Sequence, residues 1–288
     1  MMRFVLDILE LFKLRILFAS ILTSCLGYIL SLNNSPFILS NLLWGCFGLF
    51  FIFSSAAALN HLIEANIDKK MPRTLNRPIA ASRISKLLAL AIIIIFIFIG
   101  SYILFIKTNN LVLFSSILTL FLYDFVYTPL KKISSINTFV GAIPGALPFI
   151  CGWFIGNSSI NSIAVVSFLL FYFWQLPHFY SIAWINKDSY EQGGLKMISV
   201  YDTNAAKTKP YLFYSTLAFI LISYLPLYFN FLGFIYSIGV SLLNILLFYY
   251  VFKFLADVSY KSAKGVLLSS ITYPPCILLF VVIERYLV

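Results

Sequence analysis

Three side chains that carry oxygen, Asn60, Glu64 and Asp68, follow one another at intervals of four residues. On an α-helix each such step turns a side chain by only about 40°, so all three would line one face. Amide and carboxylate oxygens suit a hard cation such as Mg²⁺, which commonly keeps several waters and bridges to a substrate phosphate. The spacing therefore predicts a metal site that also binds a phosphorylated substrate.

Basic residues follow this motif directly, among them Arg73 and Arg77. Guanidinium groups bind phosphate oxygens in a fixed, forked geometry, so these two arginines are candidates for holding a diphosphate. The competing interpretation is that Glu64 and Asp68 only form surface ion pairs with the neighbouring basic residues. Because Asn60 is in phase with both carboxylates, we favour the metal-diphosphate site.

The composition says where this site must lie. Hydrophobic residues make up 61% of the 288 residues and charged residues 10%, and the mean hydropathy is +0.96. Stretches of about 20 apolar residues can each cross a hydrocarbon core as a helix. We expect an all-α, polytopic membrane protein, with residues 1–288 forming a single membrane-embedded domain. The predicted spans are 14–32, 39–60, 87–106, 111–128, 138–157, 160–183, 210–229, 231–254 and 266–285.

The segment before the first span does not resemble a cleavable signal peptide. Residues 1–13 include Asp7 and Glu10, and no small-residue cleavage pattern follows the first apolar run. An amphipathic segment on the membrane surface fits better. The four cysteines lie in or near apolar spans without metal-site spacing and are expected to be reduced thiols.

The distribution of positive charge predicts the orientation. With a cytoplasmic N-terminus, only Lys107 and Arg285 of the 20 basic residues fall on the opposite side. Such a bias is what the positive-inside rule describes. The net charge of +10 is thereby explained without nucleic acid as a partner, and it would also attract an anionic substrate.

Two predicted cytoplasmic loops, 61–86 and 184–209, are long and carry both signs of charge. The second contains Asp188 and Glu191 beside Lys187. The loops follow the second and sixth spans, which suggests two approximate helical repeats. We expect the chemistry on the cytoplasmic face.

Four segments in order resemble one known family. They are Asn60–Asp68 with Arg73-Thr74-Leu75-Asn76-Arg77-Pro78, Tyr127–Lys132, Asn137–Pro148, and Trp174–Phe179 continuing to Lys187–Tyr190 and Gly193-Gly194. From about residue 10 to 280 the chain is similar to the UbiA superfamily of membrane prenyltransferases, and within it to the protoheme IX farnesyltransferases, or heme O synthases.

That resemblance implies a UbiA-type bundle of about nine transmembrane helices, Mg²⁺ as cofactor, and transfer of a farnesyl group from farnesyl diphosphate to heme B. It also implies a location in the inner (cytoplasmic) membrane of the cell and contact with heme A synthase or a terminal oxidase assembly. Carried onto this chain, the catalytic residues are Asn60, Glu64, Asp68 and Asp188, with Glu191 as a further metal ligand. The diphosphate-binding residues are Arg73, Arg77, Lys131 and Lys187, and the acceptor-binding residues are His178, His61 and Tyr127.

The chain departs from the superfamily pattern in three places. His61 follows Asn60 where many members have aspartate, Glu64 stands where aspartate is commoner, and the second acidic motif is reduced to Asp188 and Glu191. The number of metal ions is therefore left open, two being the superfamily expectation.

Several candidates also have a purely structural interpretation. The basic residues could act only as inside-positive anchors. Each histidine could bond a backbone group rather than bind heme through its iron or a propionate. Asp124, about one turn inside the fourth span, is either functional or a carboxylate that snorkels toward the membrane surface or bonds within its helix.

Two other functions remain open. One is a prenyltransferase of the same superfamily that acts on a quinone precursor or chlorophyllide. The other is a non-enzymatic transporter or channel. A transporter usually has discontinuous helices and ionisable groups near the membrane midplane, whereas the charges here gather on one side.

Overall fold

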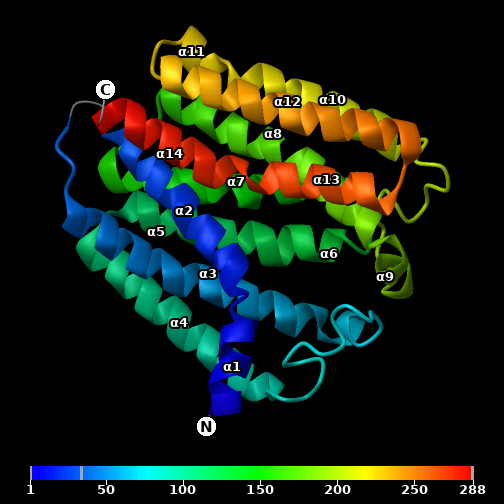
Figure 1. The fold of residues 1–288 in the computed structure, drawn as a ribbon. Coiled ribbons are helices and arrows are strands. Elements are labelled where there is room, and N and C mark those ends of the chain that lie inside the picture. The colour runs from blue at the N-terminus through cyan, green and yellow to red at the C-terminus, as the bar shows by residue number, and fades with distance from the viewer. Residues whose placement is uncertain (1, 33–34, 287–288) are drawn as a thin grey trace.

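The computed structural model describes residues 2–32 and 35–286, and within these ranges the regular elements are all helical. Figure 1 shows the bundle that they form. The elements are α1 (Met2–Leu11), α2 (Leu14–Ser31), α3 (Leu39–Asp68), α4 (Lys86–Lys107), α5 (Asn110–Phe121), the π-helical segment η1 (Leu122–Tyr127), α6 (Thr128–Leu130), α7 (Asn137–Gly156), α8 (Ser162–Ile185), α9 (Lys187–Gln192), α10 (Thr208–Ser223), α11 (Leu225–Tyr228), α12 (Phe234–Asp257), α13 (Tyr260–Ile271) and α14 (Tyr273–Tyr286).

Nine helical stretches in the described ranges are long and apolar enough to cross a membrane. Each overlaps one of the predicted spans, so the expected all-α membrane architecture is confirmed. The main difference is the second span, which was expected to end at residue 60, whereas α3 continues to Asp68. The helix continues because its polar side chains there are buried among cations of other elements. As a result, Asn60, Glu64 and Asp68 all stand on one unbroken helix.

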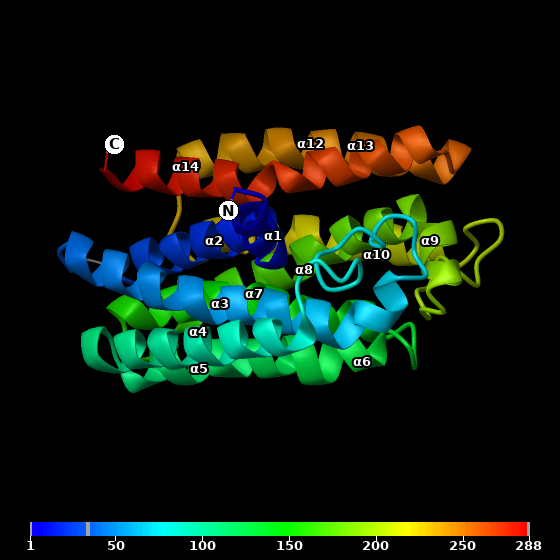
Figure 2. The ribbon, with the colours of Figure 1, turned by 90° about the horizontal axis from the view of Figure 1, so that it is seen from below.

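The helices pack as close neighbours: α2 lies along α7, α3 along α4, and α8 along α7, α10 and α13. Figure 2 shows α12, α13 and α14 as a layer on one side of the bundle, with α4 and α5 on the other. In both views the loop 69–85 and α9 lie at the same end of the bundle. The two loops expected to share one side therefore do so.

The seam between α2 and α7 is unusually close. A Cβ atom on Gly152 would collide with the backbone carbonyl of Ser24, and one on Gly27 with that of Phe149. The Ser24 hydroxyl donates across the seam to the Pro148 carbonyl, 2.8 Å away. Small residues let membrane helices approach in this way and gain dispersion contacts. The two helices are thereby held in one register.

Apolar contacts fasten the two loops together near the end of α3. Ile67 and Met71 pack with Ala183, Leu195 and Met197 in one buried cluster. A backbone hydrogen bond of 2.7 Å, from Lys196 N to Lys131 O, adds the end of α6 to the same assembly. The loops are therefore anchored around the Asp68 end of α3 rather than extended away from it.

Helix α1 is amphipathic, as expected for residues 1–13. Phe4, Val5 and Leu6 are exposed, while Asp7 is buried. Arg83 of the loop 69–85 pairs with Asp7 and, at 2.7 Å, with Glu10. These ion pairs fasten α1 to that loop, and the exposed apolar side chains suit a membrane surface.

Candidate functional site

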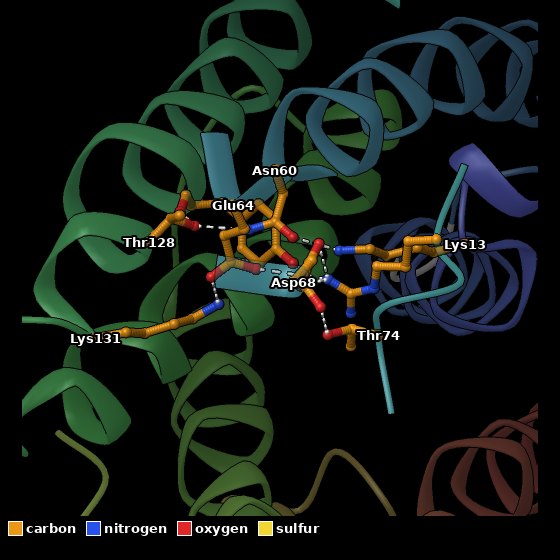
Figure 3. A network of polar contacts seen from close by, with 9 residues as sticks. Lys13, Asn60, Glu64, Asp68, Thr74, Thr128 and Lys131 are labelled. Atoms are coloured by element: carbon orange, nitrogen blue, oxygen red, sulfur yellow. Dashed lines mark hydrogen bonds and ion pairs between the residues drawn. The ribbon is translucent and has the colours of Figure 1, made fainter. Parts of the chain in front are cut away.

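The predicted oxygen donors lie together on one buried face of α3. Asn60 is 1% exposed, Glu64 6% and Asp68 0%. Figure 3 shows their side chains converging on a common region between α3, α6 and the start of α2. Helical spacing alone aligned the three residues, and burial now gives them a shared, poorly solvated environment.

Each donor contacts a cation from a different part of the chain. The Lys13 ammonium donates to Asn60 Oδ1, and Lys131 Nζ lies 2.9 Å from Glu64 Oε1. Arg77 Nη1 donates to both carboxylate oxygens of Asp68, at 2.8 and 2.9 Å. The same nitrogen is 3.8 Å from Glu64 Oε2. Two carboxylates buried side by side would repel each other, and these cations offset that repulsion.

The remaining hydrogen bonds orient the Asn60 side chain and the end of α3 that carries Asp68. Asn60 Nδ2 donates to Thr128 Oγ1 at 2.9 Å, and the Thr128 hydroxyl donates to the Tyr123 carbonyl at 2.9 Å. With its amide nitrogen engaged, Asn60 turns its carbonyl oxygen toward Lys13. Thr74 Oγ1 donates to the Asp68 carbonyl at 3.1 Å and holds the loop 69–85 against the end of α3.

The two lysines of the site differ in their electrostatics. Burial, followed by the nearby Arg77 charge, lowers the pKa of Lys13 to about 7, although the Glu64 carboxylate opposes this shift. Burial also disfavours the charged form of Lys131, but Tyr127 and the Glu64 carboxylate outweigh it and raise the pKa above its ordinary value. Lys131 is therefore a permanent cation beside Glu64.

The donor set fits a hard divalent cation. One amide oxygen and two carboxylates on a single face are ligands of the kind Mg²⁺ takes, with water completing its coordination. Within the described residues, no three or more His, Cys, Asp and Glu side chains gather as a metal-binding group. A metal here would thus use the mixed Asn60, Glu64 and Asp68 set, at the place where three cations now contact the same oxygens.

The second acidic motif lies beside this face but does not join it. Asp188 and Glu191 are exposed on α9, and their side chains make no ion pair with the α3 motif among the residues described here. The Arg73 guanidinium lies 5.6 Å from the centre of the Tyr190 ring, so it contacts α9. The structure thus brings the two loops together without bringing all of the predicted ligands together. The metal roles of Asp188 and Glu191 stay predictions.

Two other predicted basic residues have different surroundings. Lys187 Nζ donates to the Asp202 carbonyl at 2.9 Å and lies 5.3 Å from the Trp184 ring centre. Its contacts are thus within its own loop and α8, and its diphosphate role stays a prediction. Lys131 does reach the α3 face, where its ammonium also lies 4.5 Å from the centre of the Tyr127 ring.

The two histidines occupy separate places. His61 is 2% exposed, and neither ring nitrogen has a hydrogen-bond partner within the described part of the chain. His178 Nδ1 is 2.9 Å from Ser270 Oγ of α13, and its ring stacks on Trp174 with centroids 5.5 Å apart. His178 therefore belongs to the α8–α13 interface rather than to the α3 face.

Sequence reasoning missed two contributors to the site, Lys13 and Thr128. Lys13 was counted only among the basic residues of the cytoplasmic side, and Thr128 only as part of the resemblance. Helical spacing could have indicated Thr128, because it lies about one turn after Asp124 and so shares a helix face with it.

Asp124 itself is fully buried, with neither carboxylate oxygen hydrogen-bonded to another described residue. It lies in η1, and π-helical turns are frequent at functional sites.

A hollow of about 300 Å³ opens beside Glu64. Its lining is largely apolar, with Ile63, Ile67, Pro129 and Ile133 around the polar Thr128 and Lys132. A ligand with a charged end and a hydrocarbon portion could place the former near Glu64 and the latter against this wall.

Known proteins resemble this chain in sequence and in fold. Residues 20–271 match the UbiA prenyltransferase family. A protoheme IX farnesyltransferase of Flavobacterium johnsoniae is 32% identical over 291 residues, covering 98% of this chain and 95% of the relative. A solved structure on digeranylgeranylglyceryl phosphate synthase superposes with a TM-score of 0.79 at 18% identity, covering 99% of both chains. The structure of a UbiA homolog from Archaeoglobus fulgidus bound to DMAPP and Mg²⁺ superposes with a TM-score of 0.71 at 14% sequence identity. The match covers 96% of this chain and 99% of that homolog.

Proposed function

Because this chain belongs to the UbiA prenyltransferase family, we propose that it transfers the farnesyl group of farnesyl diphosphate to a vinyl group of heme B, which yields heme O. Full-length similarity to a protein named protoheme IX farnesyltransferase supports this acceptor. The structural observation that best supports this function is the buried α3 face, where Asn60, Glu64 and Asp68 contact three cations.

On the donor side, the α3 face would bind the diphosphate end of the substrate. Asn60, Glu64 and Asp68 would hold Mg²⁺, as expected from the homolog bound to DMAPP and Mg²⁺. The metal supplies charge that stabilises the departing diphosphate. Asp188 and Glu191 on the neighbouring α9 are the proposed carboxylates for a second ion.

Arg77 and Lys131 would bind diphosphate oxygens. Arg77 already donates to Asp68 and Lys131 to Glu64, so both can turn to a phosphate once a metal takes the carboxylate oxygens. Preordered positive charge at the place where negative charge develops is usually the largest catalytic contribution. Arg73 and Lys187 would act at the loop side of the same region.

The transfer would begin when the carbon–oxygen bond of farnesyl diphosphate breaks and diphosphate leaves with the bonding electrons. The vinyl group of heme B attacks the resulting allylic cation and forms the new carbon–carbon bond. Water adds to the carbon next to the porphyrin ring and releases a proton to solvent, which gives the hydroxyethylfarnesyl group. The face of Tyr127, beside Lys131, would stabilise the cation, and His178 and His61 would contact the heme.

The membrane location supports the same scheme. Nine apolar helices in the described ranges make this a multi-pass membrane protein, and both proposed substrates have large apolar portions. We propose that the protein lies in the inner (cytoplasmic) membrane with its N-terminus and active site on the cytoplasmic side. Contact with heme A synthase or a terminal oxidase assembly stays a prediction from the resemblance.

Mass spectrometry of hemes tests this function. The chain would be expressed in bacteria that lack heme O synthesis, alongside an Asp68→Asn variant as the matched control. Heme O in cells with the unaltered chain, and its loss in the variant, is the expected result. Prenylated quinone precursors or chlorophyllide without heme O would point to another UbiA reaction. Absence of any prenylated product from purified protein supplied with both substrates would favour a transporter.

A further inference from the structure

Lys13 reaches the α3 face from the junction between α1 and α2, and no role proposed above includes it. We propose that Lys13 is a further diphosphate ligand, whose ammonium group moves from Asn60 Oδ1 to a diphosphate oxygen when substrate binds. This inference rests on the proposed function only in that it requires a prenyl diphosphate as the donor.

The contacts of the three cations distinguish Lys13 from the others. Arg77 and Lys131 each contact a carboxylate, on Asp68 and Glu64 respectively. Lys13 contacts the neutral amide oxygen of Asn60 and forms no ion pair with a carboxylate among the described residues. Its charge is therefore the one in this cluster that a bound anion can satisfy without separating an existing ion pair.

The contact with Asn60 also means that the Lys13 ammonium must move when a metal ion binds. Asn60 is a proposed metal ligand through Oδ1, which is the atom that the Lys13 ammonium contacts. An ammonium and a divalent cation cannot share that oxygen, because their repulsion is strong in a poorly solvated site. The four-carbon stem of lysine is flexible and its three donors rotate freely, so the ammonium can shift to a nearby phosphate oxygen while the backbone stays in place.

The backbone conformation at Lys13 lets its side chain reach the α3 face. Lys13 adopts a left-handed conformation, with φ 50° and ψ 56°, between the end of α1 and the start of α2. This conformation is uncommon for a residue with a side chain and persists where the surroundings enforce it. Lys13 N donates to Glu10 O at 3.1 Å, and Lys13 O accepts from Ile16 N at 2.9 Å. Lys13 thus closes one helix and opens the next.

Arg83 is the positioning residue for this arrangement. Its guanidinium binds Asp7 and Glu10 of α1 and the Asn76 carbonyl at 2.5 Å. Asn76 adjoins Arg77, so one arginine ties α1 to the segment that supplies another cation of the site. Arg83 itself does not contact Asn60, Glu64 or Asp68. Changing Arg83 should therefore shift Lys13 without altering the proposed metal ligands.

The experiment measures binding of farnesyl S-thiolodiphosphate, an analogue that resists ionisation, to purified protein in detergent with Mg²⁺. Lys13→Met removes the charge and keeps most of the stem; Lys13→Arg keeps a charge. Lys261→Met, at an exposed lysine of α13, is the matched control. We expect Lys13→Met to weaken binding roughly tenfold or more, as for loss of a hydrogen bond to a charged group. Lys13→Arg should recover part of this loss, and Lys261→Met should bind as the unaltered protein does.

Arg83→Ala supplies an independent measurement if Lys13→Met folds poorly. It should weaken analogue binding in the same direction but less, because Lys13 remains and is only less well placed. Heme binding should be unchanged in every variant. Unaltered analogue affinity in folded Lys13→Met, or in Arg83→Ala should Lys13→Met not fold, would overturn the proposal.

The outcome is separable from that of the proposed function. If the unaltered chain makes heme O and Lys13→Met binds the analogue normally, only the role of Lys13 fails. If the unaltered chain makes no heme O but binds the analogue in a Lys13-dependent way, the acceptor assignment fails and the role of Lys13 stands.

Discussion

Arg77 and Asp68 are joined through a single nitrogen: Nη1 of the arginine lies 2.8 Å from one carboxylate oxygen and 2.9 Å from the other. Glu64 Oε2 is 3.8 Å from the same nitrogen. One cationic group thus lies between the two carboxylates that we assign to a metal. The arrangement keeps the carboxylates compensated, and it makes Arg77 a close neighbour of any diphosphate that binds there.

Asp68→Ala should leave a folded, membrane-inserted protein that no longer transfers the farnesyl group. The variant loses a metal ligand and the partner of Arg77, so the departing diphosphate is less well stabilised. We expect turnover to fall by about 10²-fold or more, by analogy with loss of a transition-state electrostatic contact. Single-turnover assays at saturating Mg²⁺ measure the effect, and Asp257→Ala, at an exposed residue ending α12, is the control. Turnover like that of the unaltered protein would refute the metal assignment.

Removal of divalent metal should stop turnover while leaving the protein folded. Lys13, Lys131 and Arg77 already compensate the polar face of α3, so the metal-free site carries little unbalanced negative charge. For the same reason Mg²⁺ alone should stabilise the protein only slightly in thermal unfolding. Mg²⁺ with farnesyl S-thiolodiphosphate should stabilise it more, by about 2.7 kcal/mol when the analogue is present at 100 times its Kd. Full stabilisation by Mg²⁺ alone would show that the basic residues do not compete with it.

The loops after α3 and α8 should be accessible from the cytoplasm and closed to reagents applied outside the cell. Cysteine substitutions at Ser82 and Thr203, both exposed, report on the two loops when an impermeant thiol reagent is used. Ser199 is unsuitable because it is buried and its hydroxyl donates to the Ala183 carbonyl at 2.7 Å. The unsubstituted chain measures background from its own cysteines. Labelling of either site in intact cells would overturn the orientation.

His178→Ala should weaken heme binding and leave prenyl-diphosphate binding nearly unchanged. His178 contacts Ser270 and Trp174, apart from the cations that would bind the diphosphate. Imidazole is a common ligand of heme iron. Heme titration followed by absorption spectroscopy, beside binding of the thiolodiphosphate analogue, separates the two effects. Loss of analogue binding with an unaltered heme spectrum would assign His178 to the donor side instead.

The sequence was sufficient to predict what depends on local periodicity. Runs of about 20 apolar residues have few alternatives to a membrane-spanning helix, and the four-residue spacing of Asn60, Glu64 and Asp68 survives in any unbroken helix. Lys13 could not be predicted in the same way. Its place depends on a left-handed turn and on Arg83, which is distant in sequence and close only after folding.

The second acidic motif shows the opposite limit. Asp188 and Glu191 were expected in a long loop, and the structure places both on the short helix α9. Spacing alone could not determine how far that helix lies from α3, because the loop 186–207 is positioned by tertiary contacts such as those of Met71 with Leu195 and Met197.

The close glycine contacts between α2 and α7 hold α2 rigidly against α7. Because Gly27 and Gly152 bring the two backbones together, α2 cannot slide or tilt without breaking that fit. Its first turn begins directly after Lys13, roughly 20 Å along the helix axis from Gly27 at 1.5 Å per residue. Adding a single methyl group at Gly152 would therefore displace α2 as a whole. The displacement would move Lys13, at the start of α2, relative to the polar face of α3, far from the substituted residue.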